Sequence, residues 1–210
     1  MAQLIDLTHT VRPGMRGVDV RPEFLLERDG WNAATWELYS HSGTHCDAPI
    51  HFGAHPITID QMPLDLFCGP AWIAHIEDVQ PKQLLVPADL GEIQETFEPG
   101  GCLLLHTGWA KYVDDASIWR DGLPRISDEL AQWCIDHQVK LIGVEPPSVA
   151  DVNNLPEVTR IHKTLLGAQI TIVEGLCNLD KLPDRAQFQA FPLKLEKGDG
   201  CPVRAVARID

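Results

Sequence analysis

The segment Ser40-His41-Ser42-Gly43-Thr44-His45-Cys46-Asp47-Ala48-Pro49-Ile50-His51-Phe52 places four candidate metal ligands around a glycine and a proline. The candidates are His41, His45, Asp47 and His51. Imidazole nitrogens and carboxylate oxygens together suit Zn²⁺, Mn²⁺ and similar divalent ions. A single histidine is usually packed or solvated, and a histidine-rich loop without an ion is the alternative here. Because the four donors lie so close together, the segment favours a metal-dependent enzyme.

The spacing of these residues predicts an extended backbone that bends at Gly43. In a strand, His45 and Asp47 would lie on one face about 6–7 Å apart, where they could share an ion. Cys46 would then point to the opposite face, so we do not count it as a ligand. A helix would bring His41 beside His45. The glycine, the β-branched residue and the proline of the segment all oppose a helix, and glycine allows the bend.

The composition indicates one globular domain over residues 1–210. The chain is 44% hydrophobic and 22% charged, and its formal net charge is -13. This acidity argues against nucleic acid and anionic membranes as partners. The sequence has no apolar run long enough to cross a bilayer and no visible secretory signal, so we expect a cytoplasmic protein. Its six cysteines form no C-x-x-C pair, which disfavours a zinc knuckle and indicates free thiols.

Short strands and few helices are predicted along the chain. Residues rich in β-branched and aromatic side chains, flanked by glycine or proline, predict strands at 4–7, 35–39, 71–76, 102–106, 141–144, 170–173, 188–195 and 203–208. Helices are predicted at 87–93, at 128–135 behind a Ser127 cap, and at 158–166 with Gly167 as the C-terminal cap.

The stretch from Leu130 to Glu174 alternates helix, strand, helix and strand, which predicts a pair of parallel strands joined by a helix. Glu145 follows the first of these strands, Glu174 follows the second, and His162 lies in the intervening helix. Because sites collect at the carboxyl ends of such strands, His162 and Glu174 could project to one place. Apolar neighbours surround Glu174, so this carboxylate would be buried and would require a cation nearby.

The segment from His41 to Phe52 resembles the H-x-G-T-H-x-D-x-P-x-H motif of the cyclase family of metal-dependent hydrolases. This family includes bacterial kynurenine formamidases and isatin hydrolases. The resemblance covers nearly the whole chain, because further segments have counterparts in the family, namely residues 5–9, 105–109, 141–144, 147–149, 162, 172–176, 192–195 and 198–206.

The resemblance implies an α/β fold with a central mixed, barrel-like β-sheet flanked by a few helices, assembled as dimers or tetramers. It also implies one or two ions per chain, zinc or manganese. Carried over by position, the ligands of the first ion would be His41, His45 and Asp47. Those of the second would be Asp47, His162 and Glu174, with Asp47 bridging, and His51 would be the acid–base histidine.

Two segments depart from the family pattern. Formamidases of the family carry an aspartate where this chain has Glu145. They also carry a Trp-Pro-Gly-Asp-like run, which helps to shape the substrate pocket, where this chain has residues 14–22. The change in that loop bears on formylkynurenine as the substrate more than it bears on hydrolysis.

We therefore expect a metal-dependent hydrolase that cleaves the C–N bond of a small-molecule amide, either an aryl formamide or a cyclic amide. A metal-activated water would attack, and His51 would move the proton. The alternatives are a cyclase or dehydratase that uses the same metal site and a non-catalytic, metal-stabilised binding protein. Trp31 could line a pocket or a subunit contact, and Trp133 is predicted to be core. The other histidines, at 9, 55, 75, 106 and 137, are expected to be structural.

Overall fold

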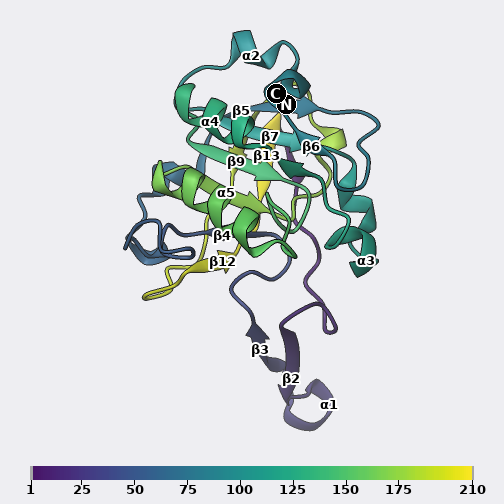
Figure 1. Ribbon diagram of the computed structural model, residues 1–210. Helices are drawn as coiled ribbons and strands as arrows, with labels where there is room; N and C mark the ends of the chain where they lie inside the picture. Colours follow the sequence, from purple (N-terminus) through teal and green to yellow (C-terminus); the bar gives the residue numbers. More distant parts are fainter. Residues whose placement is uncertain (1, 210) are drawn as a thin grey trace.

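Nine strands pair into one curled, mixed sheet in the computed structural model of the chain, which describes residues 2–209 (Figure 1). In their order across the sheet the strands are β1 (Gln3–Asp6), β13 (Val206–Ile209), β11 (Arg185–Gln189), β5 (Cys68–His75), β7 (Cys102–His106), β9 (Leu141–Val144), β10 (Thr171–Glu174), β4 (His45–Asp47) and β12 (Gly200–Pro202). Strands β5, β7, β9 and β10 run parallel to one another, and the other neighbours are antiparallel. This architecture confirms the predicted mixed, barrel-like sheet.

The central strands are buried on both faces. Along β7, Leu103 and Leu105 enter a hydrophobic cluster beneath the helices, whereas Cys102 and Leu104 enter a second cluster on the opposite face. Alternation of side chains along the strand produces this division. Parallel strands covered on both faces are recognisable as continuous apolar runs, which explains why residues 102–106 and 141–144 were predicted with their observed bounds.

Two longer helices, α4 (Asp128–Asp136) and α5 (Leu155–Gly167), pack against each other over one face of the sheet (Figure 1). The Ser127 hydroxyl caps α4 by accepting the Leu130 backbone N–H at 3.0 Å. The Asn154 side chain caps α5 by accepting the Glu157 backbone N–H at 3.2 Å. These contacts satisfy backbone donors that a helix leaves unpaired at its start.

The remaining elements are short. They are helices α1 (Leu26–Asp29), α2 (Ile93–Thr96) and α3 (Ala116–Trp119), 3-10 helices η1 (Ile59–Gln61), η2 (Leu64–Phe67), η3 (Pro87–Leu90), η4 (Trp109–Tyr112) and η5 (Leu179–Lys181), and two strand pairs, β2 (Val18–Phe24) with β3 (Ala33–Leu38) and β6 (Leu84–Leu85) with β8 (Arg125–Ile126). Within residues 2–209, no helix has both the length and the apolar character needed to span a bilayer.

Most predicted elements are confirmed within a few residues. Strands occupy the predicted ranges near 4–7, 35–39, 71–76 and 170–173, and α4 begins behind the predicted Ser127 cap. The parallel pairing of β9 with β10, with α5 between them in sequence, confirms the predicted strand–helix–strand unit. All six cysteines are free thiols, as predicted, and Trp133 is buried in the core.

Two predicted strands are too long. The strand expected at 188–195 ends at Gln189, and Pro192 makes only an isolated bridge with Val203. Proline has no N–H to donate to a ladder, which explains the early end. The strand expected at 203–208 begins three residues later, at Val206, and ends at Ile209.

Two helix predictions also need correction. The helix expected at 87–93 is the 3-10 helix η3, which stops at Leu90 because the backbone of Gly91 leaves the helical region at φ 55° and ψ -132°. Gly167 was expected to cap the last helix, but α5 includes Gly167, and Ala168 is its cap. The left-handed residue that ends this region is Gln169, with φ 62°.

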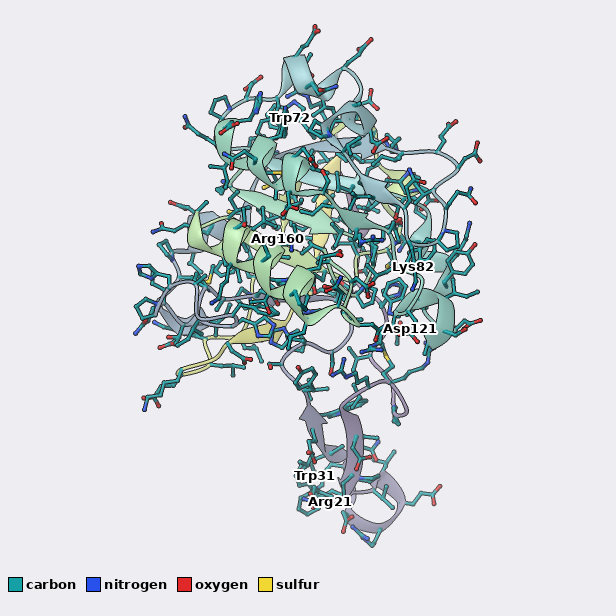
Figure 2. All side chains as sticks on the ribbon, in the orientation of Figure 1. Arg21, Trp31, Trp72, Lys82, Asp121 and Arg160 are labelled. Carbon is teal, nitrogen blue, oxygen red and sulfur yellow. The ribbon has the colours of Figure 1, made fainter. Side chains whose placement is uncertain are left out.

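A two-stranded ribbon projects from the body of the molecule (Figures 1 and 2). We call residues 18–38 the arm; it consists of β2, α1 and β3. Phe24 and Trp31 stack on each other with ring centroids 4.2 Å apart, yet both remain substantially exposed. The arm therefore carries apolar surface that it cannot bury by itself.

The cluster on the sheet face away from the helices should depend strongly on Phe188, which is fully buried. Phe188→Ala would leave a cavity and lower the free energy of unfolding by about 3–5 kcal/mol. Urea denaturation followed by circular dichroism measures this loss. Leu64→Ala is the control, because Leu64 is 68% exposed and its truncation should cost less than about 0.5 kcal/mol. Similar losses in the two variants would contradict the packing described here.

Candidate metal centre

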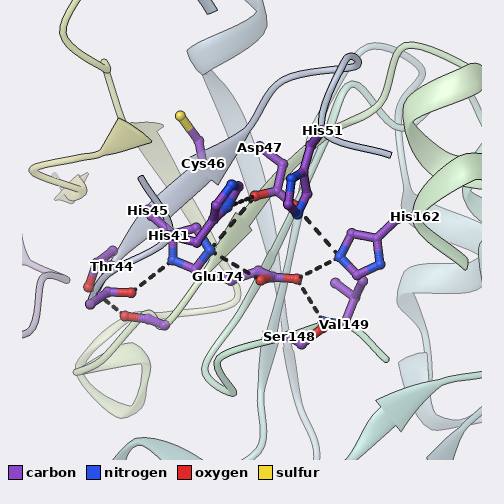
Figure 3. Close-up of polar contacts among 12 residues, drawn as sticks. His41, Thr44, His45, Cys46, Asp47, His51, Ser148, Val149, His162 and Glu174 are labelled. Atoms are coloured by element: carbon purple, nitrogen blue, oxygen red, sulfur yellow. Dashed lines mark hydrogen bonds and ion pairs between the residues drawn. The ribbon is translucent and has the colours of Figure 1, made fainter. Parts of the chain in front are cut away.

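Strand β4 brings the first group of candidate residues into the sheet. Gly43 bends the chain ahead of it with φ 60°, and β4 then pairs with β10 on one side and β12 on the other. His45 lies directly opposite Glu174 in the β4–β10 register. The predicted bend at Gly43 is confirmed, but the extended backbone is limited to His45–Asp47, because Ser42 N–H donates to the Tyr39 carbonyl in a turn ahead of the strand. Cys46 points away from the site into the core, as its alternation predicted (Figure 3).

Five candidate ligands converge from three parts of the chain (Figure 3). His45 Nε2 lies 3.3 Å from Glu174 Oε2 and 3.7 Å from Asp47 Oδ1. His162 Nε2, which α5 carries, lies 3.3 Å from Glu174 Oε1 and 3.6 Å from Asp47 Oδ2. His41 Nδ1 lies 2.9 Å from Asp47 Oδ1.

These residues form two groups that share Asp47. One consists of His41, His45 and Asp47, and the other of Asp47, His162 and Glu174; in each, the candidate ligand atoms lie within 4.8 Å of one another. The two groups match the two sets that the family resemblance implied. Asp47 is the only residue common to both, and the two oxygens of its carboxylate could serve two ions.

The histidine orientations fit metal ligation. His45 Nδ1 donates to the Gly43 carbonyl at 2.9 Å, and His162 Nδ1 donates to the Val158 carbonyl at 2.7 Å. In the neutral rings, each Nε2 therefore presents a lone pair to carboxylate oxygens. These atoms repel one another unless a proton or a cation lies between them. In addition, the buried Asp47 Oδ2 has no hydrogen-bond partner among residues 2–209, so this donor set fits a divalent cation.

The buried charges shift one another's pKa values. Burial opposes ionisation of Glu174, but contacts with His162 and His45 outweigh it and lower the pKa of this carboxyl well below its usual range. Burial lowers the pKa of His162, whereas Glu174 and Asp47 raise it, and the net shift is upward. Burial also opposes protonation of His41, yet Asp47 and Asp199 raise its pKa to about 9. In the metal-free protein, protons on histidines therefore balance the carboxylates.

His51 stands beside the two groups. Its ring stacks on His41 with centroids 3.9 Å apart, and its Nδ1 lies 3.5 Å from Asp199 Oδ2. Burial is the main cause that lowers the pKa of His51, with His41 and His162 acting in the same direction and Asp47 opposing them. His51 is therefore neutral at neutral pH and can accept a proton.

Asp199 is the residue of this site that the sequence reasoning did not single out. It forms a third group of candidate ligands with His41 and His51. Asp199 lies 158 residues from His41, in a Gly-Asp-Gly turn that resembles many surface turns. The only sequence signal was the family counterpart at 198–206, which carried no role for this aspartate.

A cavity of about 620 Å³ gives access to the candidate centre. His45, His51, His162 and Glu174 contribute to its lining. Its remaining walls are largely apolar and aromatic, with arginines among them: Tyr39, Phe52, Val113, Trp119, Val152, Leu155, Val158, Arg12, Arg16 and Arg120. His9, which we expected to be structural, also lines the cavity, and its buried Nε2 has no hydrogen-bond partner in the described part of the chain.

The two departures from the family pattern have different surroundings. Gly14, Met15 and Arg16 of the divergent loop line the cavity. Glu145 instead faces the turn after β7, where its Oε2 accepts the backbone N–H groups of Thr107 and Trp109 at 2.8 and 2.9 Å and the Thr107 hydroxyl at 2.9 Å. The loop is thus placed to contact a substrate, whereas Glu145 fixes a turn.

Comparisons with known proteins agree on one family. The sequence profile of the family described as "Putative cyclase" matches residues 5–151. A kynurenine formamidase of Salinibacter ruber (strain DSM 13855 / M31) is 33% identical over 84% of this chain and 80% of its own length. A kynurenine formamidase of Erythrobacter litoralis (strain HTCC2594) is 31% identical over 97% of this chain and 92% of its own length.

Solved structures show the same fold. Isatin hydrolase A from Ralstonia solanacearum superposes with a TM-score of 0.89 at 25% identity, over 100% of this chain and 92% of its own. A structure described as a potential metal-dependent hydrolase with cyclase activity superposes with a TM-score of 0.81 at 22% identity, over 99% of this chain and 98% of its own. The curled sheet and its helices are therefore shared across these proteins.

The raised pKa of His41 predicts how the metal-free protein responds to pH. A group whose pKa is higher in the folded state stabilises the fold fully below its unfolded pKa of about 6.5. That stabilisation is lost as the pH rises through the folded value of about 9. The free energy of unfolding, measured by urea denaturation of chelator-treated protein, should therefore fall between about pH 7 and pH 10. The fall should be smaller in His41→Gln, and equal falls in the two proteins would contradict the prediction.

Proposed function

The chain belongs to the cyclase family, and we propose that it is a metal-dependent hydrolase that cleaves the C–N bond of a small amide, either an aryl formamide or a cyclic amide. The observation that carries the proposal is the convergence of His41, His45, Asp47, His162 and Glu174 beside a cavity that His51 also lines. Relatives named kynurenine formamidase are 31–33% identical over most of the chain, which supports an amide substrate.

Zinc or manganese fits this centre, with one or two ions per chain. The candidate donors are imidazole nitrogens and carboxylate oxygens without a thiolate, which suits these metals and also Fe²⁺. When bound, such an ion lowers the pKa of a coordinated water to about 7 and polarises a carbonyl oxygen.

The protein's own residues would bind the substrate and move the proton. The neutral imidazole of His51 takes a proton at neutral pH and can return it to the leaving nitrogen. The aromatic rings of Phe52 and Trp119 offer surfaces for a planar ring, and the cavity has the size of small-molecule sites. The guanidinium group of Arg16 adds positive charge at the same cavity, whereas that of Arg12 pairs with the carboxylate of Asp114, which also lines it.

Metal content and hydrolysis, measured on the same preparation, test the proposal. Protein purified without chelator should contain about one or two zinc or manganese ions per chain. It should hydrolyse N-formylkynurenine or isatin, lose this activity on chelation and regain it on reloading. Product mass decides between reactions, because hydrolysis adds water and dehydration removes it. Absence of metal even after reloading would contradict the proposal.

Two substitutions should separate metal binding from proton transfer. Asp47→Ala removes the residue shared by both candidate groups and should abolish metal binding. His51→Ala should retain the metal but lower turnover by about 10²–10⁴-fold, the usual contribution of an acid–base group. His55→Ala is the control, because His55 is an exposed histidine of the same segment. Normal turnover by His51→Ala would contradict its assigned role.

We also propose that the chain self-associates through the arm, as a dimer or tetramer. An isolated two-stranded ribbon is marginally stable in water, so the arm gains stability by packing on another surface. Its exposed apolar side chains, including Phe24, Trp31 and Trp36, supply contact area. Arg21 and Glu23 pair with each other within the arm, at 2.9 Å, so the apolar side chains would supply the contact with a second copy of the chain.

Replacing the stacked pair on the arm, in Phe24→Ser with Trp31→Ser, should shift the particle mass measured by light scattering towards that of the monomer. Leu64→Ser is the matched control, because Leu64 is an exposed leucine of the main body. A monomeric wild-type protein, or an unchanged mass in the double variant, would show that the arm does not mediate self-association.

A further inference from the structure

A single carboxylate oxygen contacts both His41 and His51. Asp199 Oδ2 lies 3.1 Å from His41 Nε2 and 3.5 Å from His51 Nδ1. The two rings stack on each other with an interplanar angle of 28°, so one oxygen can reach a nitrogen of each. His41 is a candidate metal ligand and His51 is the candidate acid–base group, so Asp199 links the two roles.

Backbone contacts fix the position of Asp199. Its carbonyl accepts the Ala48 N–H at 2.9 Å, and the preceding Gly198 carbonyl accepts the Ile59 N–H at 2.8 Å. The next residue, Gly200, pairs with Asp47 in the β12–β4 register. A Cβ atom at Gly200 would lie 2.6 Å from His41 Cε1 and 2.8 Å from a backbone oxygen, so only glycine allows this close approach.

Each candidate histidine ligand has one ring nitrogen that faces away from the other ligands, here called the outer nitrogen. His41 differs from His45 and His162 in the group that contacts this nitrogen. Backbone carbonyls hold Nδ1 of His45 and of His162. The outer nitrogen of His41, Nε2, faces the Asp199 carboxylate instead. A carboxylate on the far nitrogen of a histidine ligand fixes the ring and strengthens its other nitrogen as a donor. Asp199 thus contacts the outer nitrogen of His41, as the backbone carbonyls contact those of His45 and His162.

The same oxygen would select the tautomer of His51. The negative charge of Asp199 lies 3.5 Å from His51 Nδ1 and favours the proton on that nitrogen. His51 Nε2 is then left unprotonated and is the nitrogen that can accept a proton from the reaction. Orientation of a catalytic histidine by a carboxylate on Nδ1 is an established way of preparing a general base.

We propose that Asp199 is a positioning residue that fixes the ring of His41 for metal binding and the tautomer of His51 for proton transfer, through one shared oxygen. Its effect on turnover rests on the proposed hydrolase function. Its effect on metal affinity does not, because that effect requires only His41 and the ion.

The experiment compares Asp199→Asn, Asp199→Ala and Asp199→Glu with the wild-type protein. Zinc affinity is measured by competition with a chromophoric chelator, and kcat and KM are measured with the amide that the wild type hydrolyses. We expect Asn and Ala to weaken zinc binding and lower kcat, each by about 10–100-fold, with little change in KM. The Glu variant should recover part of both losses, because it restores the negative charge.

Glu196→Gln is the matched control, since Glu196 is an exposed carboxylate of the same loop region. The urea midpoint of each metal-free variant separates positioning from folding. A lower midpoint with unchanged zinc affinity and kcat would make Asp199 merely structural and overturn the proposal. Unchanged values in all three measurements would overturn it as well.

If the wild type hydrolyses no amide, the proposed function is wrong. The zinc titration still tests whether Asp199 positions His41 for metal binding. Weaker zinc binding by Asp199→Asn would then support the positioning of His41. Wild-type affinity in that variant would overturn the inference.

Discussion

Two buried carboxylates, Asp47 and Glu174, face histidine nitrogens, and this arrangement requires positive charge among them. Burying ionised groups is costly, and the cost is recovered only when opposite charge lies close with good geometry. The backbone carbonyls of Gly43 and Val158 prevent the histidines from turning their Nδ1 atoms to the carboxylates. Protons on the histidines therefore offset part of the negative charge of these carboxylates, and a divalent cation between them would offset more of it.

The sheet holds this arrangement in place by its topology. Strand β4 lies between β10 and β12, so His45 meets Glu174 on one side while Asp199 precedes the strand on the other. Helix α5 delivers His162 from above the sheet, with Ile161 and Leu165 packed in the core beside it. Hydrophobic clusters cover both faces of the central strands next to β4. Binding of an ion here would stabilise the whole fold, since the unfolded chain lacks the site.

The sequence predicted the parts of the molecule whose signals are local. Residues 102–106 form an apolar run between glycines and polar residues, and such runs identify a central strand without tertiary information. Residues 190–195 look similarly apolar, but Pro192 has no N–H to donate and makes only an isolated bridge with Val203, so the ladder ends at Gln189. Asp199 was missed for another reason. Its proposed role depends on contacts with His41 and His51, which are more than 140 residues away, and no local pattern distinguishes it from a solvated turn residue.

The geometry also indicates which of the two segments that depart from the family pattern can contact a substrate. Of the two departures from the family pattern, Glu145 accepts three hydrogen bonds within the turn after β7, so this change adjusts a structural contact. The loop that carries Met15 and Arg16 lines the cavity, and the Arg16 guanidinium lies 5.4 Å from the ring of Tyr39, which is itself 5.4 Å from His41. A substrate bound near His41 would therefore lie close to this loop. Of the two departing segments, the loop is therefore the one that can contact a molecule in the cavity, because Glu145 does not line it.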